Sequence, residues 1–471
     1  MNDVLMSDLA LLVPELILVG MALALILAAR RIRRTPVAGV ATVLAALAAA
    51  LASVFSSGAG TGFGGMIVVD GYSQFFKVLV AAALALVALL SVKSADGEQP
   101  PSGEYHALLL LASTGMMFAV SASDLLTLYL SLELMTLCSY ILVGLRVERP
   151  TSNEAAIKYF LLASFASALL IYGISLTYGV TGTTDFAAIA AALAQQSAGD
   201  NLLPLVAIVL VAAGLAFKIA AVPFHTWAPD AYQGASAPVA AFLAAGSKAV
   251  GLAALGRVCL AAFGSAAHVL SVVLVVLAAL SILVGSITAL AQTDMKRLLA
   301  YSSISHAGYA LLGLIAGTPE GASATMTYAF FYVFMTLGAF GVVIALGERG
   351  ESLDGYQGLA AQRPRTAALM LLFLMSLTGL PPTAGFVAKF VVILSVVRAG
   401  HTLLAVLAVI CAVVSAFFYL RVAVIMYMKE PQAPAPSRYP VAVFAALALA
   451  ALVTLVGGIF PGLVVPWAVS P

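Results

Sequence analysis

This sequence has few charged residues for its length. Asp, Glu, Lys and Arg make up 9% of its 471 residues, whereas a soluble domain carries about 25%. The formal net charge is only +2, so no strong field would attract an acidic partner. We therefore exclude a soluble cytosolic enzyme, a nucleic-acid-binding protein and a disordered chain.

Metal ligands are also few and scattered. Cys138, Cys259 and Cys411 lie far apart within apolar runs, and no CxxC pair occurs. The five histidines include no pair at the spacing of ligands on one helix. Iron–sulfur clusters and structural zinc need clustered ligands. The sequence therefore predicts that this chain holds no metal and no redox cofactor of its own.

Apolar residues dominate what remains. They make up 63% of the chain, and the mean hydropathy is +1.10. A membrane-spanning helix needs roughly 20 apolar residues, and apolar runs bounded by polar, Gly or Pro residues recur along almost the whole chain. They predict an all-α, polytopic membrane protein with about 14 transmembrane helices and short loops.

Lysine and arginine are distributed unevenly between alternate loops. With the N-terminus outside, fourteen of the 22 fall in predicted cytoplasmic loops and three, Lys77, Arg257 and Arg398, at outer span ends. Cytoplasmic loops are enriched in cations. The first apolar run precedes its arginines, the reverse of a signal peptide, so it is a retained span. We predict a multi-pass protein with both termini on the outer side.

Among the ionisable residues inside predicted spans, four are candidates for function, namely Glu133, Lys218, Lys248 and Lys389. A charge at the centre of a span costs about 2.5–3.5 kcal/mol. Glu133 and Lys218 could form an ion pair that only holds helices together. Lys248 and Lys389 have no evident acidic partner, because Glu133 is the only carboxylate that we place at mid-membrane. Desolvation makes a buried lysine easier to deprotonate, so we interpret these lysines as proton carriers.

Residue counting suggests how Glu133 and Lys218 interact. At 1.5 Å per residue from the predicted span starts, the two differ by about 10 Å in depth. A permanent close contact is therefore not favoured. We predict a pair that switches between close and separated arrangements.

Helix breakers lie next to two of the lysines. Pro223 follows Lys218 by five residues, and the stretch 379–382 (GLPP) precedes Lys389. Proline inside a helix removes a hydrogen bond and interrupts it, so spans seven and twelve should be discontinuous; a simple packing kink is the alternative. Broken spans five apart match two inverted five-helix repeats. The predicted segments are 1–103 (helices 1–3), 104–262 (helices 4–8), 263–430 (helices 9–13) and 431–471 (helix 14).

Two histidines are weaker candidates. His225, with Asp230, lies at the predicted cytoplasmic end of span seven, where it could admit protons or merely cap a helix. His306 falls inside span ten. A lone buried histidine is more often a satisfied core group, but histidine titrates near neutral pH. His306 could thus relay protons between Lys248 and Lys389.

Five stretches carry a family resemblance: YLSLELMTLCSYILVGL, EAAIKYFLLASFASALLIYGISLTYGVTGTT, VPFHTWAPDAYQGASAPVAAFLAAGSKAVGLAAL, AQTDMKRLLAYSSISHAGYALLGL and LTGLPPTAGFVAKF. With them the chain resembles the antiporter-like membrane subunits of bacterial respiratory complex I (NADH:quinone oxidoreductase). The YQGA after WAPD and the GSKA around Lys248 favour the subunit N family, the counterpart of mitochondrial subunit 2. Lys389 also agrees with subunit N, because subunit M carries glutamate there. Subunits of Mrp-type cation/proton antiporters share the Glu and Lys positions.

The resemblance implies roles for these residues. Glu133 and Lys218 would form the input pair, Lys248 the central relay and Lys389 the output, with His306 on a hydrated axis. Protons would cross the bacterial cytoplasmic membrane, driven by electron transfer from NADH to quinone in partner subunits that carry FMN and iron–sulfur clusters. The expected partners are neighbouring antiporter-like and small membrane subunits and the lipid bilayer. A component of a cation/proton antiporter and a purely structural scaffold are the alternatives.

Overall fold

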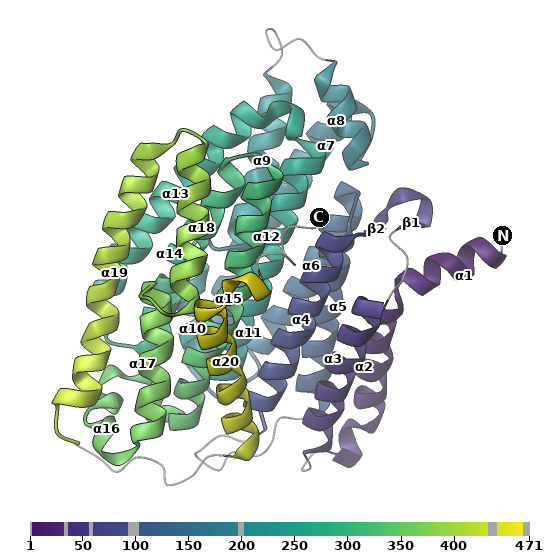
Figure 1. The fold of residues 1–471 in the computed structure, drawn as a ribbon. Helices are drawn as coiled ribbons and strands as arrows, with labels where there is room; N and C mark the ends of the chain where they lie inside the picture. Colours follow the sequence, from purple (N-terminus) through teal and green to yellow (C-terminus); the bar gives the residue numbers. More distant parts are fainter. Residues whose placement is uncertain are drawn as a thin grey trace.

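The computed structural model describes residues 2–32, 36–55, 60–92, 103–195, 202–431 and 440–464. These residues are almost entirely helical, and the long helices lie side by side in one bundle (Figure 1). Eleven helices of the described chain are long and apolar enough to cross a membrane. This confirms an all-α polytopic membrane protein, while the number of 14 spans stays a prediction. Four of the counted cations, Arg33, Arg34, Lys93 and Arg438, lie outside the described residues.

The described residues form twenty α-helices and one short hairpin. The first part of the chain contributes α1 (Asn2–Leu11), α2 (Val13–Ile32), α3 (Val37–Phe55), α4 (Gly71–Leu90), α5 (Gly103–Ser121), α6 (Leu125–Val143), α7 (Pro150–Thr181), α8 (Phe186–Ala194), α9 (Leu203–Lys218), α10 (Trp227–Gly234), α11 (Ala237–Phe242) and α12 (Lys248–Arg257). The second part contributes α13 (Ala267–Leu290), α14 (Met295–Ile315), α15 (Pro319–Leu346), α16 (Leu359–Gln362), α17 (Pro364–Thr378), α18 (Ala384–Arg398), α19 (Thr402–Met428) and α20 (Val441–Ile459). Two short strands, β1 (Gly60–Gly62) and β2 (Ile67–Val69), form an antiparallel hairpin before α4.

Aspartate side chains fix where several helices begin. Asp70 accepts a hydrogen bond from the Ser73 amide at the start of α4, and the Ser73 hydroxyl accepts one from the Asp70 amide. The side chains of Asp124 and Asp294 accept hydrogen bonds from backbone amides in the first turns of α6 and α14. Such caps satisfy amides that the first helical turn leaves unpaired. The caps at Asp124 and Asp294 thus fix the starting points of α6, which carries Glu133, and of α14, which carries His306.

Two helices are broken where the sequence predicts it. α9 ends at Lys218 and α10 begins at Trp227, while α17 ends at Thr378 and α18 begins at Ala384. The interruptions near Pro223 and at 379–382 are thereby confirmed. Gly379 has φ +91°, and a Cβ there would lie 2.8 Å from Cδ of Lys389. Glycine at position 379 thus permits both the positive φ of the turn and the close approach of the Lys389 side chain.

A third irregularity was not predicted. A π-helical turn at 243–247 lies directly before Lys248, the first residue of α12. Such turns occur mostly as local insertions in α-helices and often at functional sites. Each of the lysines 218, 248 and 389 therefore lies at or near a point where a helix departs from regular geometry.

The helices differ sharply in how much of them is buried. α14 and α15 are buried almost throughout, whereas α2, α3, α7, α13, α19 and α20 each keep an exposed apolar face. Exposed apolar faces suit lipid or neighbouring membrane subunits. The candidate site is built on the buried central helices and on the two broken ones.

Candidate functional site: a row of buried ionisable side chains

Helices α6 and α9 bring Glu133 and Lys218 into contact. Nζ of Lys218 lies 3.3 Å from Oε1 of Glu133 and donates a hydrogen bond of 2.7 Å to the Thr136 hydroxyl. Ser167 of α7 donates to the same carboxylate oxygen. The Lys218 side chain is buried, but that of Glu133 is 21% exposed. The pair therefore exists, and the Glu133 side chain is only partly buried.

The depth difference expected for this pair is wrong. Residue counting assumed that spans five and seven begin at the same height. α9 packs along α7, which is 32 residues long and extends beyond the start of α6 (Figure 1). Because α9 begins further out, Lys218 at its end reaches the level of Glu133. Whether the contact switches stays a prediction.

Lys248 has a different environment. Its ammonium is buried and donates a hydrogen bond of 2.6 Å to the Ser303 hydroxyl of α14. No carboxylate of the described chain forms an ion pair with it. A buried cation held by a neutral hydroxyl is destabilised relative to a paired one.

Helix α14 connects the environment of Lys248 with His306. Ser303 and His306 are three residues apart and lie on one face of the helix. Nδ1 of His306 lies 2.6 Å from the Tyr328 hydroxyl, and Nε2 lies 3.3 Å from the Tyr419 hydroxyl. His306 is therefore a buried, hydrogen-bonded group on the line between two lysines. This position fits both a relay and a satisfied core histidine.

Lys389 lies at the far end of this line. Its ammonium is 4.6 Å from the centre of the Tyr309 ring, which is one turn beyond His306 on α14. It also donates a hydrogen bond of 2.8 Å to the carbonyl of Thr378. Thr378 is the last residue of α17, where carbonyls lack an intrahelical donor. The helix break thus supplies the lysine with its acceptor.

His225 is not joined to this row by hydrogen bonds. It lies half-buried in the segment between α9 and α10, and its Nδ1 has no hydrogen-bond partner within the described residues. The structure therefore places it beside the broken helix without linking it to Lys218 or Lys248. Its role in admitting protons stays a prediction.

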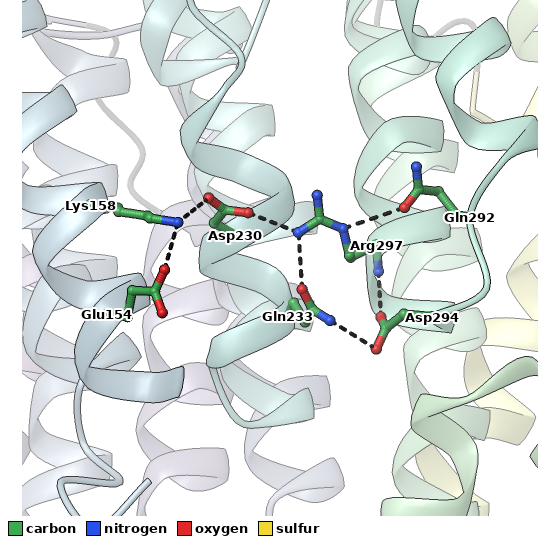
Figure 2. Close-up of polar contacts among 7 residues, drawn as sticks. All are labelled: Glu154, Lys158, Asp230, Gln233, Gln292, Asp294 and Arg297. Atoms are coloured by element: carbon green, nitrogen blue, oxygen red, sulfur yellow. Dashed lines mark hydrogen bonds and ion pairs between the residues drawn. The ribbon is translucent and has the colours of Figure 1, made fainter. Parts of the chain in front are cut away.

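Asp230 bridges helices from both predicted repeats (Figure 2). Its Oδ2 accepts from Lys158 of α7 at 3.1 Å, and its Oδ1 accepts from Arg297 of α14 at 2.8 Å. Arg297 also donates to Gln233, and Lys158 lies 2.7 Å from Glu154. Lys158 therefore takes part in a polar bridge between α7, α10 and α14.

An ion pair joins the end of α12 to the start of α4. Both guanidinium nitrogens of Arg257 donate to the Asp70 carboxylate, at 2.9 and 2.8 Å. Burial alone would raise the pKa of Asp70, but the hydrogen bonds and charge of Arg257 outweigh it and hold that pKa below its usual value. The arginine predicted at an outer span end is thus ion-paired.

Sequence reasoning missed a buried ion pair in the N-terminal helices. Nζ of Lys77 on α4 lies 2.8 Å from Oε1 of Glu15 on α2, and both side chains are at most 2% exposed. The contact is short, but neither carboxylate oxygen receives a well-aligned hydrogen bond in the described chain. Glu133 is therefore not the only buried carboxylate among the helices. Each residue lies inside an apolar run, which is the feature that singled out the other four.

Breaking this pair should destabilise the protein. Glu15→Leu leaves Lys77 buried without a counter-charge, which costs about 3–5 kcal/mol, whereas replacing both residues by apolar ones is often neutral. We expect Glu15→Leu to lower the thermal unfolding midpoint and Glu15→Leu with Lys77→Met to restore it. Thermal unfolding of the purified protein in detergent measures both. Equal stability of the wild type and Glu15→Leu would contradict a charged pair.

The fold and the row of buried lysines beside broken helices define a class, the antiporter-like membrane subunits. The chain belongs to the NADH:quinone oxidoreductase/Mrp antiporter family, whose profile matches residues 122–415. It is similar to NADH-quinone oxidoreductase subunit N of Desulfovibrio desulfuricans, with 47% identity over 92% of this chain and 90% of the relative. A subunit N of Rhizobium meliloti is 42% identical over 95% of this chain and 94% of the relative.

Solved structures agree with this assignment. A chain of respiratory complex I from Thermus thermophilus is 34% identical and superposes with a TM-score of 0.83, covering 97% of this chain and 100% of its own. A chain of an Mrp complex from Dietzia has a TM-score of 0.82, covering 98% of this chain and 96% of its own, at 24% identity. The second likeness concerns the fold alone.

Proposed function

We propose that the chain is the proton-translocating subunit of the N type in the membrane arm of NADH:quinone oxidoreductase. The observation that carries the proposal is the row of buried ionisable groups, from Glu133 and Lys218 through Lys248 and His306 to Lys389. The names of relatives that match over most of the chain support it. A cation/proton antiporter subunit is the second candidate, favoured only by the shared fold.

The environments of the three lysines suggest what each does with a proton. Lys218 beside Glu133 is stabilised as an ammonium and would hold a proton while the pair is closed. Lys248 has only the Ser303 hydroxyl, so it would pass a proton on when one arrives. Lys389, held by the Thr378 carbonyl, would release the proton at the far end. Water molecules would bridge the gaps that hydrogen bonds between side chains leave.

The remaining assignments follow from the same proposal. Residues 104–262 and 263–430 would be the two halves related by inverted repetition, each with one broken helix. FMN and iron–sulfur clusters would reside in partner subunits, whose electron transfer drives this chain. The partners would be adjacent antiporter-like and small membrane subunits of the bacterial cytoplasmic membrane.

Purification of the tagged chain from its own membranes tests the proposal. We expect subunits with NADH-oxidising activity to co-purify, and the reconstituted complex to take up protons only while NADH reduces quinone. Co-purification of antiporter subunits alone, with sodium-dependent proton exchange and no NADH oxidation, would establish the second candidate instead.

The orientation gives a separate prediction. Because cations gather in alternate loops, both ends of the chain should lie outside the cytoplasm. A C-terminal fusion to a reporter that is active only in the cytoplasm should stay silent, and the same reporter placed after Arg365 should be active. An active C-terminal fusion would mean that the number of spans is odd.

A further inference from the structure

A cavity of about 530 Å³ lies between α15 and α18, apart from the row of buried lysines. It opens where α14 and α18 end and α15 begins, which is the outer end in the proposed orientation. Its polar lining consists of Thr318, Glu320, Ser323, Thr327, Ser395 and Arg398. Its volume is that of a site for a small molecule, which is typically about 300–1,000 Å³.

The polar side chains of this cavity are almost all without protein partners. Glu320 and Arg398 both line it, yet no ion pair or hydrogen bond joins either of them to another described residue. The hydroxyls of Ser323 and Thr327 likewise have none, although both residues are buried. Glu320 and Arg398 are exposed at the opening of the cavity, and all four groups are therefore free to bind a partner from outside the chain.

The cavity is amphipathic along its depth. Glu320 and Arg398 are at its rim, at the ends of their helices. Thr327 lies seven residues deeper, about 10 Å along α15, and Val391 and Leu394 of α18 form an apolar wall. A ligand that fits must carry charge at one end and an apolar chain at the other.

We propose that this cavity binds a phosphatidylethanolamine molecule of the outer leaflet. The Arg398 guanidinium suits the lipid phosphate, which it can contact through two parallel N–H donors. The Glu320 carboxylate suits the lipid ammonium, which donates charge-assisted hydrogen bonds. One acyl chain lies against Val391 and Leu394. An anion and a cation at one rim, not paired with each other, complement a zwitterionic headgroup better than an anionic one.

Photo-crosslinking to the intact purified complex tests this proposal. The complex is placed in nanodiscs that contain a phosphatidylethanolamine with a diazirine near the glycerol end of one acyl chain. Labelled peptides are identified by mass spectrometry. We expect labelling of the segment 384–398, reduced at least fivefold by Arg398→Gln. Arg365→Gln, an equal charge change at the opposite end of the bundle, is the matched control and should leave labelling unchanged.

Headgroup selectivity separates this lipid from other occupants. The same probe with a phosphatidylglycerol headgroup should label the wild type several-fold less, and Glu320→Gln should remove that difference. Equal labelling by both headgroups, or no effect of Arg398→Gln, would overturn the proposal. A probe that labels only a neighbouring subunit would also overturn it, because a protein would then cover the cavity. NADH oxidation by each variant shows that the complex is intact.

Discussion

Replacing Lys248 with methionine should lower proton pumping by the assembled complex at least about tenfold, which corresponds to about 1.4 kcal/mol in the barrier. Methionine fills a similar volume but carries no proton. Because Lys248 has no carboxylate partner in the described chain, its removal leaves no unpaired buried charge. Assembly should therefore survive. Proton uptake into vesicles per NADH oxidised, with the amount of complex measured on native gels, gives the result.

Two further variants sharpen the interpretation. Lys248→Arg keeps the positive charge, but a guanidinium does not release its proton in proteins, so this variant should also fail to pump. Lys429→Met changes an exposed lysine at the end of α19 and should pump normally. Normal pumping by Lys248→Met would show that the lysine is structural. Pumping restored by Lys248→Arg would show that charge, and not proton transfer, is required.

The positions of the lysines and the helix breaks could be predicted because both are local features. A lysine inside an apolar run, or a Gly-Leu-Pro-Pro stretch, is visible without knowing its neighbours. The partners of these residues could not be predicted. Ser303, Tyr328 and Tyr419 meet the site from different helices, and hydropathy does not give the rotation of a helix that is buried on all sides.

The depth of each residue across the membrane was harder to predict than its position in the sequence pattern. Residue counting separated Glu133 from Lys218, because helices of unequal length do not begin at one level. The same limit hid the contact between Glu15 and Lys77, which requires knowing that α2 and α4 present these residues at one depth. The π-helical turn before Lys248 has no breaker residue beyond Gly246, so it could not be predicted.

The partly exposed carboxylate of Glu133 leads to the second large expected effect. Glu133→Gln keeps the shape of the side chain and its contact with Ser167, but removes the charge beside Lys218. The ammonium then has only neutral acceptors, the amide oxygen and the Thr136 hydroxyl, so protonation of Lys218 is less favourable. We expect proton uptake coupled to NADH oxidation to fall about tenfold, with assembly retained because glutamine keeps the size and shape of the side chain.

Two further variants complete the test, one that shortens the acidic side chain at 133 and one that removes a distant carboxylate. Glu133→Asp keeps the charge but withdraws it by one methylene, so it should pump at an intermediate rate. Glu430→Gln removes an exposed carboxylate beyond α19 and should have no effect. If Glu133→Gln pumps like the wild type, the pair takes no part in translocation. If it prevents assembly while Glu133→Asp assembles, the pair is a structural clasp. Reduced pumping by an assembled Gln variant, with partial recovery in Asp, requires a carboxylate that controls the proton on Lys218.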